Sequence, residues 1–224
     1  PGPLDVASAE SIRATLRGYY LAKSWEDLVP WVREADLVRP MMQNYYNRRP
    51  FDQGNRDIQI LQLVRSRSGD LPCVYARVVL QPSLEQKSVL LFEGENQSYQ
   101  IDWETDVVHQ FMEWEDFQET RPTDPVPFRV TIKETDYYNY SFSDEDKFRS
   151  WIVYDPQRGV RLFGYSERGG PVDRELVEII TSKGAGRTAA ILKLAYPEDP
   201  ANADQVHITE IGSVSWMINY DAFR

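Results

Sequence analysis

A proline-rich segment near the middle of the chain most limits how this sequence can fold. Residues 121–127, Arg-Pro-Thr-Asp-Pro-Val-Pro, hold three prolines in seven positions. Proline lacks the N–H that a helix interior needs, and it shifts the preceding residue toward extended conformations. The segment therefore predicts an extended spacer, and the 224 residues are long enough for a domain on each side. We expect a linker over residues 1–7, a first domain over 8–120 and a second over 128–224.

The beginning of the first domain carries helical signals. Ser8 is expected to cap a first helix. The apolar residues of that helix recur at helical spacing: Ile12, Leu16, Tyr19 and Tyr20. Ser24 and Asp27 resemble a capping box for a second helix, which Pro30 should keep short. Asp36 is expected to cap a third helix that ends near residue 48.

Residues 56–103 change from helical to strand signals. Strands are expected over 58–64, 73–80, 88–92 and 99–103. The turn signals between them are Gly69-Asp70 and Gly94-Glu95-Asn96. Successive hairpins predict an antiparallel meander, followed by one or two short helices within 104–120. The first domain is therefore expected to be α+β.

The second domain has its own order of elements. Strands are expected over 128–132, 148–154, 160–165, 189–195 and 206–211. A helix should start at Gly169-Gly170-Pro171, since proline favours the first helical position. The resulting order, β-β-β-α-β-β, is that of a five-stranded OB barrel. A small α+β sandwich with the same order remains an alternative.

Charge and cysteine content exclude several classes of protein. The formal charge is −10, so binding to nucleic acid is not expected. A single cysteine excludes an internal disulfide framework and a multi-cysteine zinc site. No uninterrupted apolar run is long enough to span a membrane. Neither a metal nor another cofactor is expected.

Several segments resemble known proteins. The segments at 19–27, Tyr-Tyr-Leu-Ala-Lys-Ser-Trp-Glu-Asp, and at 38–46, Val-Arg-Pro-Met-Met-Gln-Asn-Tyr-Tyr, precede the meander. Together they resemble the nuclear transport factor two superfamily, which implies helices packed on a curved antiparallel sheet, a cone, over roughly residues 8–118. That superfamily includes isomerases, dehydratases and non-enzymatic binding modules.

The second domain carries a looser resemblance. Tyr-Tyr-Asn-Tyr-Ser-Phe-Ser-Asp at 137–144 and Phe-Gly-Tyr-Ser-Glu-Arg-Gly at 163–169 are similar to segments of uncharacterised bacterial envelope-type proteins. Many of these stand behind an N-terminal membrane anchor. The resemblance implies an extracytoplasmic, anchored protein that touches the membrane only through a segment preceding Pro1. A cytoplasmic location is the alternative.

An acidic run gives the clearest candidate interaction surface. Residues 88–120 contain no Lys or Arg and nine acids. The proposed surface comprises Glu104, Asp106, Glu113, Glu115 and Asp116. Such a face would attract a basic or amine-bearing partner, and calcium binding is a weaker alternative. A solvated acidic face without a partner is the simpler explanation, because runs of charge are usually solvated faces.

A pocket in the first domain is the second candidate site. Its aromatic lining is expected to come from Tyr45, Tyr46, Tyr75 and Trp103. His109 and Asp57 are the candidate general bases, while His207 lies in a predicted strand and is a weaker candidate. The same aromatic residues would also suit a protein core.

The aromatic stretch at 137–142 suggests one further type of site. Aromatic side chains on OB surfaces stack on bases or sugars, but acidic neighbours here favour core packing or a protein partner. No motif indicates a reaction. We therefore expect a non-enzymatic binding or interaction module, whose partner is a protein or a small molecule. An isomerase-like or hydratase-like enzyme acting in the first domain is the alternative.

Overall fold

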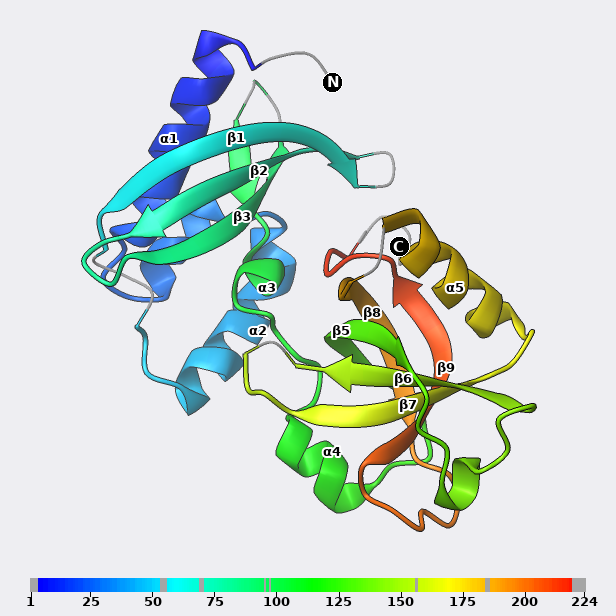
Figure 1. The fold of residues 1–224 in the computed structure, drawn as a ribbon. Coiled ribbons are helices and arrows are strands. Elements are labelled where there is room, and N and C mark those ends of the chain that lie inside the picture. The colour runs from blue at the N-terminus through cyan, green and yellow to red at the C-terminus, as the bar shows by residue number, and fades with distance from the viewer. Residues whose placement is uncertain are drawn as a thin grey trace. The chain divides into compact units, whose positions relative to one another are not determined.

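The computed structural model divides the chain into two compact units, Pro1–His109 and Gln110–Arg224. It describes residues 4–52, 56–68, 71–94, 96, 98–155, 157–183 and 186–218. Both units combine helices with β-sheet, which confirms the α+β class (Figure 1). Each unit is described here by itself.

The first unit contains four helical segments and a four-stranded sheet among its described residues. Its elements are α1 (Val6–Tyr20), η1 (Glu26–Trp31), α2 (Ala35–Arg48), β1 (Ile58–Ser68), β2 (Leu71–Leu80), β3 (Glu85–Glu93), β4 (Tyr99–Ile101) and α3 (Trp103–Asp106). The strands pair in sequence order, and every pair is antiparallel. The predicted meander is therefore confirmed. The predicted turn at Gly69-Asp70 and the middle of the turn at Glu95 lie outside the described residues.

The start of α1 corrects two predictions. The helix begins at Val6, so the last two residues of the expected linker are helical. Its cap is Asp5 rather than Ser8, since the Ser8 N–H donates to Asp5 Oδ1 at 2.8 Å. An aspartate in front of the first turn accepts from the free N–H groups there and also favours the helix dipole. Ser8 itself is buried.

The other two helix starts give one agreement and one difference. Ser24 and Asp27 exchange hydrogen bonds reciprocally, Ser24 N–H to Asp27 Oδ2 at 3.1 Å and Asp27 N–H to Ser24 Oγ at 3.4 Å. This is the predicted reciprocal pair of hydrogen bonds, and it spans the start of the short η1, whose first turn contains Asp27. The start of α2 differs from the prediction, because the preceding residue is Glu34 with a φ of 52° and Asp36 lies inside the first turn. A carboxylate there still favours the positive end of the helix dipole.

The second unit is built around a closed five-stranded barrel. Its elements are α4 (Trp114–Thr120), β5 (Val126–Thr135), η3 (Tyr140–Phe142), β6 (Phe148–Tyr154), β7 (Arg161–Glu167), α5 (Pro171–Lys183), β8 (Thr188–Ala195) and β9 (Gln205–Ser213). The barrel order is β5-β6-β7-β9-β8, closed by pairing of β8 with β5. All pairs are antiparallel except β7 with β9. Alternate residues along the strands fill the interior, as in other small barrels.

The division between the units differs from the predicted boundary. It falls between His109 and Gln110, so residues 110–120 belong to the barrel unit. The Trp114 ring stacks on Phe128 at 4.0 Å, and Phe117 also packs into the barrel core. The expected spacer is also shorter, because β5 already begins at Val126. The prolines determine an extended backbone, but apolar burial determines which unit the preceding helix joins.

The aromatic stretch around η3 packs on the outside of the barrel. The Tyr137 ring stacks on Phe163 at 4.0 Å, and the Phe142 ring stacks on Tyr165 at 4.1 Å. Phe142 and Tyr165 are both buried. Packing against the barrel, rather than stacking on a base or sugar, therefore occupies these rings.

No helix within the described residues is long and apolar enough to cross a membrane.

Candidate functional site

A groove of about 570 Å³ opens on the barrel unit where the end of β7, the strand β9 and the first turns of α5 meet. We call it the β9 groove. Its apolar walls come from Pro171 and Val172 on α5 and from Ile208 and Ile211 on β9. Three glutamates, Glu167, Glu175 and Glu210, also line it, together with Tyr165, Gly170, His207 and Thr209. The volume lies within the range of sites that bind small molecules or parts of a larger ligand.

The groove exists because β9 leaves its neighbour early. β9 pairs with β7 over only three positions, the last of which is Tyr165 with His207. On its other side β9 stays paired with β8 as far as Ser213. Residues 208–213 therefore have no partner strand on the β7 side within the part of the chain that the structure describes. In Figure 1, β9 lies between β8 and α5.

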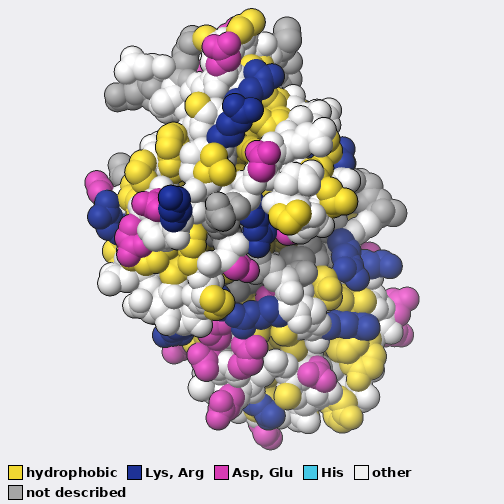
Figure 2. Space-filling model, turned by 90° about the vertical axis from the view of Figure 1, so that its left-hand side faces the viewer, with side chains coloured by type: hydrophobic (Ala, Val, Ile, Leu, Met, Phe, Trp, Pro, Cys, Tyr) yellow, Lys and Arg dark blue, Asp and Glu magenta, His cyan; other side chains and the backbone are white. Residues whose placement is uncertain are grey.

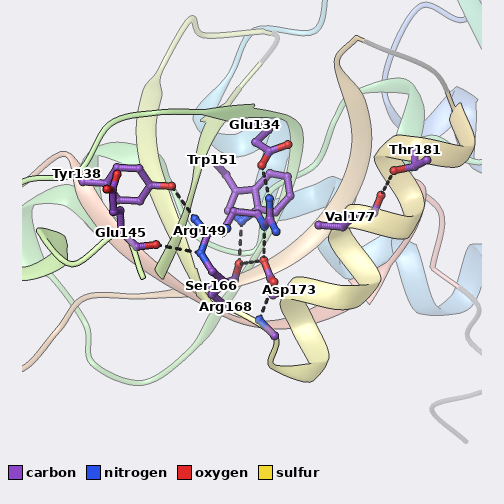
Figure 3. A network of polar contacts seen from close by, with 11 residues as sticks. Glu134, Tyr138, Glu145, Arg149, Trp151, Ser166, Arg168, Asp173, Val177 and Thr181 are labelled. Atoms are coloured by element: carbon purple, nitrogen blue, oxygen red, sulfur yellow. Dashed lines mark hydrogen bonds and ion pairs between the residues drawn. The ribbon is translucent and has the colours of Figure 1, made fainter. Parts of the chain in front are cut away.

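A buried polar network holds the first turn of α5 against the barrel (Figure 3). Asp173 is 3% exposed, and its Oδ1 accepts from Arg149 Nε at 2.7 Å and from Ser166 Oγ at 3.2 Å. Its Oδ2 accepts from the Gly169 N–H at 2.8 Å. Trp151 Nε1 donates in turn to Ser166 Oγ at 2.8 Å. The network joins β6, β7 and α5, so the α5 wall of the β9 groove is fixed before any ligand arrives.

The charge of the β9 groove is negative. Glu167 and Glu175 are exposed, and neither has an ion-pair partner among the described residues. Glu210 is neutralised by Lys193, with Nζ and Oε2 at 2.7 Å. Among the residues that the structure describes, neither Lys nor Arg lines the groove. Two carboxylates on apolar walls suit a ligand that has both positive charge and apolar surface.

His207 lies at one end of the β9 groove against aromatic rings. Its ring centroid is 4.9 Å from that of Phe142 and 5.8 Å from that of Phe148. Burial is the largest effect and lowers the pKa of His207; Glu167 opposes this by raising it, and Lys147 lowers it further. The imidazole is therefore neutral near pH 7 and adds no positive charge to the groove.

Four of the sequence-predicted residues come together in the first unit. The Trp103 ring lies 5.4 Å from Tyr45, 6.1 Å from Tyr46 and 5.3 Å from His109. Trp103 Nε1 also donates to the Tyr46 hydroxyl at 3.2 Å. Burial is the main cause that raises the pKa of Tyr46 well above its usual value. We call these four residues the aromatic cluster.

The rings of the aromatic cluster contact one another, with Trp103 buried and the other three half-buried. Tyr45 meets Trp103 edge to face, and the Arg49 guanidinium lies 4.4 Å from the Tyr45 ring centroid. His109 Nδ1 is 3.8 Å from Glu104 Oε1, and 13% of the His109 side chain is exposed. These contacts are those of packed interior residues, which favours the core alternative for the aromatic cluster.

Tyr75 and Asp57 lie outside the aromatic cluster. Tyr75 is half-buried on β2, and burial raises the pKa of its hydroxyl. No ring contact joins Tyr75 to the aromatic cluster in the described structure. Asp57 is exposed just before β1, where its Oδ1 accepts from the Ile58 N–H at 2.9 Å. An exposed carboxylate engaged in this way lacks the enclosure that makes an effective general base.

The acidic surface expected at 104–116 needs correction. Glu104 and Asp106 are 2% and 4% exposed, so they belong to the interior of the first unit. Asp106 accepts from the hydroxyls of Tyr19 and Tyr20, at 2.9 and 3.2 Å, and from Lys87 Nζ at 2.8 Å. A run of acids gives no indication of which of them is buried, because the partners that satisfy Asp106 come from distant parts of the sequence.

The remaining acids of the proposed surface lie in the second unit. Glu113 and Glu115 both pair with Arg158, at 2.6 and 2.8 Å. Asp116 is exposed. On the face shown in Figure 2, Asp and Glu side chains alternate with Lys, Arg and hydrophobic ones. That face therefore carries no single continuous acidic field.

Sequence reasoning missed the β9 groove. The residues that line it come from three elements with no shared spacing, and none of them forms a motif. The only available signal was Gly169-Gly170-Pro171, which correctly predicted the helix that forms one wall. Within the ranges that the structure describes, no group of three or more His, Cys, Asp and Glu residues is placed to hold a metal ion.

Comparison of the chain with models of protein families, with curated proteins and with solved structures found no match.

Proposed function

We propose that this chain is a non-enzymatic binding module whose β9 groove takes a basic segment of a partner protein. The observation that carries this proposal is the pair of exposed carboxylates, Glu167 and Glu175, beside apolar walls and without a cation in the groove. A lysine or arginine side chain combines a charged end with an apolar stem, and so matches both features.

The expected affinity is modest. Exposed ion pairs contribute about 0.2–1 kcal/mol each, and apolar burial adds about 25 cal/mol per Å². The network around Asp173 holds one wall in place, which lowers the ordering cost of binding. Together these effects support a weak interaction of the transient kind.

The finer fold assignments are part of the same proposal. The barrel order, with its single parallel pair, supports an OB-like second unit. The helices and the four-stranded antiparallel meander support a cone-like first unit related to nuclear transport factor two. Both fold types present varied binding surfaces, so the fold supports recognition in general and the groove defines the partner.

An isomerase-like or hydratase-like enzyme in the first unit has less support. Of its two candidate bases, Asp57 is exposed and His109 packs against Trp103 and Tyr45. A general base needs a substrate within hydrogen-bond reach, and the rings of the aromatic cluster occupy the space around His109.

The test is a binding measurement with matched variants. Fluorescence anisotropy would compare a labelled peptide of alternating lysine and valine with its glutamate–valine counterpart. We expect only the lysine peptide to bind, and we expect Glu167→Gln with Glu175→Gln to weaken it about tenfold, in line with the loss of two ion pairs.

Glu178→Gln is the control for that measurement. Glu178 is an exposed glutamate on α5 that does not line the groove. Like each single groove substitution, Glu178→Gln removes one negative charge. The Glu178→Gln protein should therefore bind the lysine peptide about as tightly as the unaltered protein does. Equal binding by the double variant and the unaltered protein would remove the groove as the site.

A further inference from the structure

We infer, on the basis of the proposed function, that the basic segment binds as an extended strand added to the free edge of β9. The bound segment would pair its backbone with residues 208–213 and place basic side chains beside Glu167 and Glu175. The bound segment would therefore have an extended backbone, a conformation that the charge and the apolar surface of the groove do not by themselves require.

The free edge is the first observation behind this inference. β9 pairs with β7 over Gln205–His207 and with β8 from His207 to Ser213, so beyond His207 its only paired neighbour within the described residues is β8. A strand edge presents N–H and C=O groups at regular intervals, and an added strand satisfies them. The β9 groove lies along this edge and includes four consecutive residues of it, 208–211.

The departure of β7 explains why the chain itself leaves this edge open. After Glu167 the backbone turns through Gly169, which has a φ of 73°, and enters α5 at Pro171. The Gly170 N–H closes that turn on the Glu167 carbonyl at 2.9 Å. Asp173 then anchors the helix start, so β7 has no further residues to continue the pairing.

Two of the usual side-chain devices that block strand addition are missing from residues 208–213 of β9. Natural edges are often protected by lysine or proline, and residues 208–213 of β9 contain neither. The one charged side chain there, Glu210, already pairs with Lys193. Lys193 is thereby neutralised and offers little repulsion to an incoming basic strand.

The length of the added strand is limited. Two register shifts interrupt the pairing of β8 with β9, at Ile191/Leu192 and Lys193/Leu194. Such bulges increase the local twist, so a long straight partner strand would diverge from β9. A segment of about four residues spans about 13 Å at the usual rise of a strand, and this suits a short linear motif.

A second copy of this chain is a poorer occupant than a basic segment. Edge-to-edge pairing of two β9 strands would bring Glu167 and Glu175 of one copy toward the same residues of the other. Like charges at close range oppose association unless a cation separates them. Charge complementarity therefore favours a basic segment of a different protein.

The experiment is a scan of backbone methylation in the peptide. Hexapeptides that alternate lysine with valine would be made with a single N-methyl group at each position in turn, and their binding to the full chain would be measured by anisotropy. Methylation removes one N–H and leaves the charge unchanged. Because only alternate N–H groups of a strand point to one neighbour, we expect about tenfold loss at alternate positions and little change between them.

The outcomes separate this inference from the proposed function. Peptide binding that depends on Glu167 and Glu175 but is equal for all methylated forms would overturn strand addition and leave the proposed function in place. Absence of binding by every basic peptide would overturn both.

Hydrogen exchange supplies a measurement on the protein side. The peptide should slow exchange of backbone amides within 208–213, and Glu178→Gln should leave that protection unchanged. Protection of the same amides without peptide, together with dimers in sedimentation, would instead identify a second copy as the occupant and overturn the inference.

Discussion

Arg149 Nε donates to Asp173 Oδ1 at 2.7 Å, which joins the strand β6 to the first turn of α5. The Asp173 side chain is 4% exposed and the Arg149 side chain 21%. Glu134 also accepts a hydrogen bond from Arg149, so the guanidinium bridges two acids (Figure 3). The two acids raise the pKa of Arg149, against the opposing effect of burial.

Asp173→Ala should destabilise the barrel unit. The substitution leaves the half-buried Arg149 without one acid, and it also removes the acceptor for the Ser166 hydroxyl and the Gly169 N–H. Removing one partner of a buried pair commonly costs about 3 kcal/mol. Urea unfolding followed by tryptophan fluorescence would measure this. The exposed Glu178→Ala on the same helix is the control, and equal loss by the two variants would contradict the role of the network.

Gly164→Ala should destabilise the barrel by overpacking. A Cβ at Gly164 would lie 2.7 Å from Val153 Cγ2 and 2.9 Å from Ile208 Cδ1, which are too close for a methyl group. Forced shifts in a packed interior cost about 1–3 kcal/mol. Gly186→Ala is the matched control, because nothing lies within 4 Å of that position. The midpoint of urea unfolding should be clearly lower for Gly164→Ala than for Gly186→Ala. Equal midpoints would show that the side chains around Gly164 can move aside at little cost.

Alkaline pH should weaken the first unit through Tyr19. Burial, aided by the nearby Asp106, raises the pKa of Tyr19 well above its ordinary value of 10.0. Below that value the tyrosine is neutral in both folded and unfolded chains, so the stability is complete. As the pH rises above 10.0 the unfolded chain ionises first, and the free energy of unfolding decreases.

A pair of melting curves tests this effect. The melting temperature of the unaltered protein should fall more steeply above pH 10 than that of Tyr19→Phe, which has no hydroxyl to ionise at this position. Tyr140→Phe is the control, because Tyr140 is 53% exposed. Identical slopes for the unaltered protein and Tyr19→Phe would contradict the effect of burial on Tyr19.

Local pattern predicted most of the elements. The capping box at Ser24 and Asp27, the meander and the strand order of the second half depend on neighbouring residues, so the sequence contains them directly. Helix starts were predicted less well, since Ser8 was expected as the cap of α1 and the structure has Asp5 in that position.

Sites were harder to predict, because the hydrogen-bond partners of buried polar groups come from distant parts of the sequence. Asp106 belongs to an acidic run in sequence, yet two tyrosines from α1 and a lysine from β3 make its burial favourable. The β9 groove depends on where β9 separates from β7, which no spacing in the sequence reveals. Tyr45, Tyr46, Trp103 and His109 lie together, while Tyr75 and Asp57, which were expected at the same pocket, lie apart from them.

His207 should titrate below its ordinary pKa of 6.5. Burial beside Phe142 and Phe148 lowers the pKa, and Lys147 adds to this effect while Glu167 opposes it. A lowered pKa means that stability is complete above pH 6.5 and decreases as acid protonates the unfolded chain first. The Hε1 signal of His207 in NMR should have its midpoint below 6.5. Glu167→Gln removes the opposing charge and should lower the midpoint further, and a midpoint above 6.5 would contradict the burial of the ring.

Deletion fragments should locate the start of the barrel unit. A fragment of residues 110–224 retains Trp114 and Phe117, which are 1% and 0% exposed and pack against Phe128. A fragment of residues 121–224 starts at the predicted spacer and lacks both rings. Loss of a buried Trp or Phe costs about 3–5 kcal/mol each, while a domain has only about 5–15 kcal/mol in total.

We therefore expect the longer fragment to unfold cooperatively in urea and the shorter one to be unfolded or strongly destabilised. Trp114→Ala in the longer fragment is the intermediate case, because it removes one ring and its hydrogen bond to Asp155 but keeps Phe117. A shorter fragment as stable as the longer one would show that α4 merely covers the barrel. A stability that falls from the longer fragment to its Trp114→Ala variant and again to the shorter fragment would show instead that α4 completes the core of the barrel. Without α4, the Phe128 ring would be open to water.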